Sequence, residues 1–72
     1  MKTFSFYEAI ELVLTKGKRM RRSSWAYGNC LFFINSDILC TTYIMKETPT
    51  TYETYIPTPD DIISNDWLEV IQ

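Results

Sequence analysis

The chain begins with hydrophobic residues at helical spacing. The apolar positions of this segment recur every three or four residues and would form one stripe on a helix: Phe6, Ala9, Ile10, Val13 and Leu14. The stretch "SFYE" has the pattern of a capping box, with Ser5 as the N-cap and Glu8 at the third helical position. Gly17 is suited to the left-handed conformation that ends helices. The pattern therefore predicts a helix over 5–16.

The next segments have the pattern of strands. Over 18–22 a single apolar residue, Met20, alternates with arginines. Residues 30–34, "CLFFI", form a short apolar run that is typical of a buried strand. The sequence "NSD" at 35–37 favours a turn. We therefore expect 38–45 to return along the preceding strand as the second arm of a hairpin.

The last third of the chain predicts a strand, a short helix and a strand. Residues 51–56 read as an extended piece that is limited on both sides by proline. The sequence "TPDD" then opens a helix, with Thr58 as the cap, Pro59 in the first turn and two acids at the positive end of the helix dipole. Residues 67–71 are expected to form the final strand.

This order of elements predicts the α+β class. We expect one domain over 1–72, in which the N-terminal helix packs on a small antiparallel sheet and a short second helix precedes the last strand. A chain of 72 residues buries only roughly 60% of its unfolded surface. With 46% hydrophobic and 15% aromatic residues, it has more apolar side chains than such a core can hold. The composition therefore favours a homo-oligomer.

Charge is distributed unevenly along the chain. The formal net charge is -2, yet residues 1–36 carry six basic and two acidic side chains, a balance of +4. Residues 37–72 carry one basic and seven acidic side chains, a balance of -6. The run "KRMRR" at 18–22 holds four of the seven basic residues, and aromatic residues follow it. An acidic second half would repel a nucleic-acid polymer, so the run suits a compact phosphorylated ligand better.

Several classes of site are excluded by residue type. There is no His and no CxxC, so we expect no metal site and no cofactor. Cys30 and Cys40 are too few for a disulfide framework, and we expect both to be buried thiols in a reducing cytosol. No signal-peptide core or membrane-length apolar run occurs. Without a His or a nucleophile motif, catalysis is not expected.

Two stretches in order resemble a known family. These are "KGKRMRRSSW" and "YIPTPDDIISNDWLEV", and together they are similar to the second type of Thoeris anti-defence protein, a small phage-borne family. The matching positions are Gly17, Lys18, Arg21, Arg22, Trp25, Tyr55, Pro57, Asp61, Ile62, Ile63, Asp66 and Trp67. The chain departs from the family pattern in its shorter middle hairpins, and in Tyr55 where Trp is more usual. Residues 35–54 match poorly.

The resemblance implies a molecular sponge. Family members bind the cyclic ADP-ribose isomer made by an immune TIR protein, without cutting it, in the cytoplasm of the host. They assemble as homotetramers with ligand pockets at subunit interfaces. The matching positions, carried over one by one, give most of the ligand-binding set, and Tyr27 is added as an aromatic neighbour of the basic run. The set is Arg21, Arg22, Trp25, Tyr27, Tyr55 and Asp61.

The chemistry of these residues suits such a ligand, although each has a structural alternative. Arginine forks bind phosphate oxygens, aromatic faces stack on purines, and a carboxylate accepts from ribose hydroxyls. Arg21 and Arg22 point to opposite faces of a strand, so Arg21, which shares its face with Arg19, is the first choice. Alternatively, the arginines are solvated strand charges, Trp25 is a core anchor and Asp61 only completes a helix N-terminus. In the same way, Tyr27 could be a loop residue and Tyr55 part of a sheet face.

Two other functions stay open at this stage. A module that blocks a host defence protein would use the Tyr- and Thr-rich surface, and it would have a protein partner with no response to nucleotides. A small enzyme would release a chemically changed product. The sequence does not identify which cyclic ADP-ribose isomer or cyclic oligonucleotide would be bound.

Overall fold

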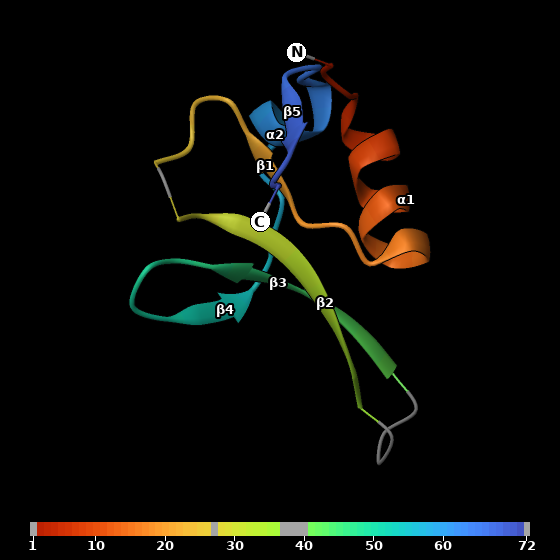
Figure 1. Ribbon diagram of the computed structural model, residues 1–72, viewed down its shortest axis with the longest axis vertical. Helices are drawn as coiled ribbons and strands as arrows, with labels where there is room; N and C mark the ends of the chain where they lie inside the picture. Colours follow the sequence, from red (N-terminus) through yellow and green to blue (C-terminus); the bar gives the residue numbers. More distant parts are fainter. Residues whose placement is uncertain (1, 27, 37–40, 72) are drawn as a thin grey trace.

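The computed structural model describes residues 2–26, 28–36 and 41–71. These residues form two helices and five strands, and Figure 1 shows that the arms of one hairpin, β2 and β3, project away from the helices. In chain order the elements are α1 (Phe6–Lys16), β1 (Met20–Arg22), β2 (Cys30–Ser36), β3 (Thr41–Glu47), β4 (Tyr52–Thr54), α2 (Pro59–Ile63) and β5 (Trp67–Glu69). No helix in these residues is long and apolar enough to cross a membrane.

The predicted α+β class is confirmed. The strands form one antiparallel sheet in the order β4-β3-β2-β1-β5, so the last strand lies beside the first. Helix α1 contacts β1, β2, β5 and α2, which places both helices on one side of the sheet. Phe4 also pairs with Trp67, so the segment before α1 covers the outer edge of β5.

Helix α1 begins and ends where the sequence predicts. The Ser5 hydroxyl accepts a hydrogen bond from the Glu8 backbone N–H, and the Glu8 carboxylate accepts one from the Ser5 N–H. Gly17 ends the helix with φ of 64°, in the left-handed region. The predicted stripe is confirmed except at Leu14, which lies at one edge of the stripe and is 43% exposed.

The strands differ from the prediction mainly at their ends. The turn predicted at 35–37 is wrong for Asn35 and Ser36, which continue β2 and pair with Thr42 and Thr41. Backbone pairing with a long partner strand outweighs their turn preference here. The expected start of β3 at 38–40 lies outside the described residues. Strands β4 and β5 are shorter than predicted, whereas β3 extends two residues further, to Glu47.

The core lies between α1 and the centre of the sheet. Its fully buried side chains come from α1, β1, β2 and β5, and they are Ala9, Val13, Met20, Leu31 and Trp67. The arginine-rich strand therefore has one apolar residue that points into this core. Because side chains alternate along a strand, Arg22 points to the same side as Met20, and Arg21 points to the other.

Candidate functional site

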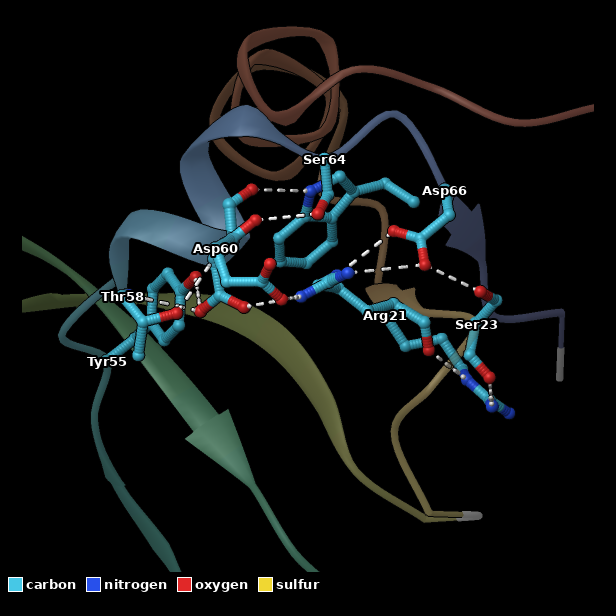
Figure 2. A network of polar contacts seen from close by, with 10 residues as sticks. Arg21, Ser23, Tyr55, Thr58, Asp60, Ser64 and Asp66 are labelled. Carbon is cyan, nitrogen blue, oxygen red and sulfur yellow. Dashed lines mark hydrogen bonds and ion pairs between the residues drawn. The ribbon is translucent and has the colours of Figure 1, made fainter.

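Arg22 is the centre of a buried ion cluster (Figure 2). Its guanidinium Nη1 lies 2.7 Å from Asp60 Oδ2 and 3.2 Å from Asp61 Oδ1, and its Nε lies 3.0 Å from Asp66 Oδ1. Asp66 also accepts a hydrogen bond from the Ser23 hydroxyl at 2.6 Å. The cluster therefore ties β1 to α2 and to the residue that precedes β5.

The charges of this cluster stabilise one another. Hydrogen bonds from Arg22 and Ser23 lower the pKa of Asp66. For Asp61, burial acts to raise the pKa, but hydrogen bonds from Tyr55, Thr58 and Arg22 outweigh it, and the pKa is lowered. The carboxylates in turn raise the pKa of Arg22, through hydrogen bonds to Asp66 and Asp60 above all. Arg22, Asp61 and Asp66 are thus charged at neutral pH.

Asp61 connects the ion cluster to the aromatic residues. Its Oδ2 accepts hydrogen bonds from the Tyr55 hydroxyl at 2.8 Å and from the Thr58 backbone N–H at 3.3 Å. The Thr58 hydroxyl accepts from the Asp61 N–H at 3.1 Å, which completes the capping box of α2. The Asp61 carbonyl also accepts from the Trp67 indole N–H at 3.2 Å. Burial, and then the contact with Asp61, raise the pKa of Tyr55, so its hydroxyl keeps its proton.

Arg21 lies on the opposite face of the sheet, and Figure 2 shows it pointing away from the carboxylates. Its Nη2 donates to the carbonyls of Trp25 at 2.8 Å and Ser23 at 3.4 Å, and its Nε donates to the Arg22 carbonyl at 3.2 Å. Its Nη1 group has no partner among the described residues. The guanidinium is therefore held in place while two of its N–H donors stay available.

Arg21 lines a cavity of about 370 Å³ on this face. The other lining residues come from β2, β3, the loop between β1 and β2 and the segment after β5: Gly28, Asn29, Cys30, Glu47, Val70 and Ile71. Cys30 is buried as predicted, and burial is the main reason that its thiol pKa is raised. Its Sγ lies 3.6 Å from both Arg19 Nη1 and Glu47 Oε2. The cavity thus combines a positioned arginine with neutral and acidic groups.

Trp25 lies on the helix side, half-buried among other aromatic rings. Its ring centroid is 5.2 Å from that of Trp67 and 6.3 Å from that of Tyr55, both in edge contacts. The Lys46 ammonium lies 4.3 Å from its ring centroid. A second, smaller cavity of about 190 Å³ adjoins this group and is lined by Lys46, Glu53, Thr54, Tyr55, Ile56, Thr58 and Asp61.

The predicted ligand-binding residues therefore fall into two groups. Arg22, Tyr55 and Asp61 are joined by hydrogen bonds, and Trp25 packs against Tyr55. Arg21 lies on the other face of the sheet. Tyr27 lies outside the described residues.

The sequence reasoning missed Lys46. A signal was present, because Lys46 is the single basic residue of 37–72 and directly follows the strand predicted at 38–45. Its position over Trp25 depends on strand pairing, which the sequence pattern does not give. Among the described residues, no group of His, Cys, Asp and Glu side chains is arranged to hold a metal ion.

One comparison with known proteins gives a match. The sequence model of the family described as "Tad2-like: Thoeris anti-defense 2-like domain" matches residues 4–70, which is most of the chain and includes both groups of predicted site residues. No curated protein matches the chain at a significant level.

Proposed function

Because the chain belongs to the Thoeris anti-defense 2-like family and so functions against Thoeris defence, we propose that it acts as a sponge. It binds a cyclic ADP-ribose-type signal, or a related cyclic nucleotide, in the cytoplasm of the phage-infected host. It holds the ligand without changing it chemically. It performs no catalysis and needs no cofactor. The ligand-binding set is the predicted one: Arg21, Arg22, Trp25, Tyr27, Tyr55 and Asp61.

The observation that carries this proposal is the setting of Arg21. Three backbone carbonyls fix its guanidinium at the wall of the larger cavity, and Nη1 keeps its donors free of partners in the described part of the chain. An arginine held in this way is preorganised to donate to phosphate oxygens. The cavity volume of about 370 Å³ is within the range of small-molecule sites.

The division of the set between two faces supports a pocket that is shared by subunits. A ligand that contacts Arg21 and Tyr55 of one chain would have to pass through the sheet. Two copies can instead offer Arg21 from one chain and the Trp25–Tyr55 side from the other. We therefore propose a homotetramer with ligand pockets between subunits, in which closed symmetry repeats the same contact. Exposed apolar side chains, such as Tyr52 and Ile71, are available for the interfaces.

The first prediction concerns stability in the presence of ligand. A sponge must hold its signal with about nanomolar affinity, roughly 12 kcal/mol. At a ligand concentration 1,000-fold above Kd, the folded state should gain about 4 kcal/mol. We expect cyclic ADP-ribose isomers, or cyclic dinucleotides, to raise the melting temperature. Denaturing the filtered complex and analysing the supernatant by mass spectrometry should recover the ligand intact.

Other outcomes would identify the alternatives. A changed nucleotide product would indicate an enzyme. A saturable protein partner, with no melting response to any cyclic nucleotide, would support a module that blocks a host defence protein. The exposed side chains of Ile56 and Ile63 favour that second function, because they would suit a protein interface. Either result would contradict the sponge.

The second prediction concerns Arg21. Arg21→Ala should weaken ligand binding about ten- to a hundredfold, because a hydrogen bond to a charged group contributes roughly 1.5–3 kcal/mol. Arg21→Lys should restore only part of the loss, since it keeps the charge and loses the fork. Calorimetric titration, run beside a melting curve of each variant, measures both effects. Full affinity in a folded Arg21→Ala protein would show that the arginine run is a solvated strand face.

A further inference from the structure

Lys46 separates the smaller cavity from the face of Trp25. Its ammonium lies 4.3 Å from the Trp25 ring centroid, and the same side chain lines the cavity together with Tyr55 and Asp61. Trp25 itself does not line the cavity, although two of its neighbours do. In this state, the flat surface that a planar group would stack on is covered by the protein's own cation.

Glu53 on the neighbouring strand offers the Lys46 side chain a second partner. Lys46 on β3 pairs directly with Glu53 on β4, and both side chains line the smaller cavity. Directly opposed residues have Cβ atoms about 4.5–5.5 Å apart, well within reach of a lysine and a glutamate. No carboxylate of the described residues forms an ion pair with Lys46, so the Glu53 position is available.

Both positions of Lys46 depend on weak contacts. Lys46 and Trp25 are half-buried, so solvent still reaches the contact between cation and ring, and Glu53 is exposed, so an ion pair with it would contribute little. The stacking of a nucleobase on an aromatic side chain is stronger than either. A planar base that reached Trp25 could therefore displace Lys46 toward Glu53 at little cost.

The volume of the cavity agrees with this exchange. At about 190 Å³ it is smaller than the usual range of small-molecule sites, so a nucleoside needs more room than the observed state gives. Moving Lys46 off Trp25 would join the ring face to the cavity. The Asp61 carboxylate and the hydroxyls of Thr54 and Thr58 would then face the sugar of a bound nucleoside.

We propose that the Trp25 face and the adjoining cavity form a nucleoside subsite, and that Lys46 is a lid which the base displaces toward Glu53. This subsite rests on the proposed function, since it would receive the base and sugar of the sequestered nucleotide. Lys46 then determines specificity, because only a group that stacks better than the lysine gains entry. A phosphate without a base gains nothing from the displacement.

Binding of adenosine to wild type and Lys46→Ala tests the lid. Adenosine has the base and sugar without a phosphate, and the Trp25 indole N–H resonance, assigned with Trp25→Phe, reports stacking. Lys46→Ala should bind adenosine about two- to fivefold more tightly, the gain from removing one competing contact between the cation and the ring. Glu53→Gln should bind it more weakly than wild type. Inorganic pyrophosphate should not bind more tightly to Lys46→Ala.

Lys2→Ala is the matched control. Lys2 also lies over an aromatic ring, with its ammonium 5.2 Å from the Phe4 centroid, but it lines neither cavity. Its removal should leave adenosine binding unchanged. Equal or weaker adenosine binding by Lys46→Ala would overturn the lid, and so would the absence of adenosine binding in both proteins. If adenosine binds more tightly to Lys46→Ala but no cyclic nucleotide raises the melting temperature of wild type, the nucleoside subsite is supported and the sponge function is contradicted.

Discussion

Replacing Arg22 by methionine should lower the free energy of unfolding by about 3–5 kcal/mol, the usual cost of removing one partner of a buried ion pair. Methionine keeps most of the aliphatic volume and removes the charge. Asp61 is then left in a buried position without its cation, whereas Asp60, whose side chain is 75% exposed, can be solvated. Urea denaturation followed by tryptophan fluorescence measures the loss.

Arg19→Met provides the matched control. Arg19 also forms an ion pair, with Glu47 at 2.8 Å, but the two side chains are 33% and 40% exposed. Exposed pairs contribute less than about 1 kcal/mol, so this variant should lose little stability. Similar small losses in both variants would show that the Arg22 cluster is not a major source of stability.

The pH dependence of stability gives a second measure of the same cluster. Asp61 and Asp66 have lowered pKa values in the folded protein. Their contribution is therefore complete above the unfolded pKa of about 3.9, and it is lost as pH falls through the folded values. Wild type should lose this stability in acid below about pH 4. Arg22→Met should lose less of it, because Arg22 is the largest cause of the lowered Asp66 pKa and one of several causes of the lowered Asp61 pKa.

The features predicted correctly are those set by neighbouring residues. The Ser5–Glu8 capping box and the Thr58 cap each lie within one turn of chain, so the sequence alone predicts both helix starts. Gly17 likewise ends α1 through its own backbone preference. Short-range chemistry of this kind needs no knowledge of the fold.

The ion cluster could not be predicted in the same way. Asp66 lies 44 positions after Arg22 in the sequence, and the pairing of β1 with β5 brings the two together. The family motifs singled out both residues without indicating that they bind each other. The alternation of side chains along a strand did predict that Arg21 and Arg22 point to opposite faces of the sheet. This prediction needs only the local strand geometry.

Lys46 and the end of β2 illustrate the same limit. The register of β3 with β4 places Lys46 at the smaller cavity, and no local pattern fixes that register. The turn signal at Asn35 was real, but it competed with seven paired positions along β2 and β3. Local preference yields where a ladder of backbone hydrogen bonds can continue.

Mixing two variants that each bind the ligand weakly should restore wild-type sites if the pocket is shared between subunits. Arg21→Ala removes the arginine of one face, and Tyr55→Leu removes the ring and hydroxyl of the other while keeping apolar volume. Each variant alone should bind at least about tenfold more weakly, because each lacks a direct contact with the ligand. Light scattering and melting curves check that both remain folded and assembled.

The extent of restoration distinguishes the two arrangements. When equal amounts are co-refolded, a shared site is intact only if an Arg21→Ala chain supplies the Tyr55 side and a Tyr55→Leu chain supplies Arg21. Random assembly of a closed oligomer makes this combination in about one quarter of the sites. Calorimetry of the mixture should then find that about one quarter of all sites bind the ligand with wild-type affinity. A site built within one chain can never be intact in this mixture, so zero restoration would place Arg21 and Tyr55 in one chain's own pocket and contradict the shared one.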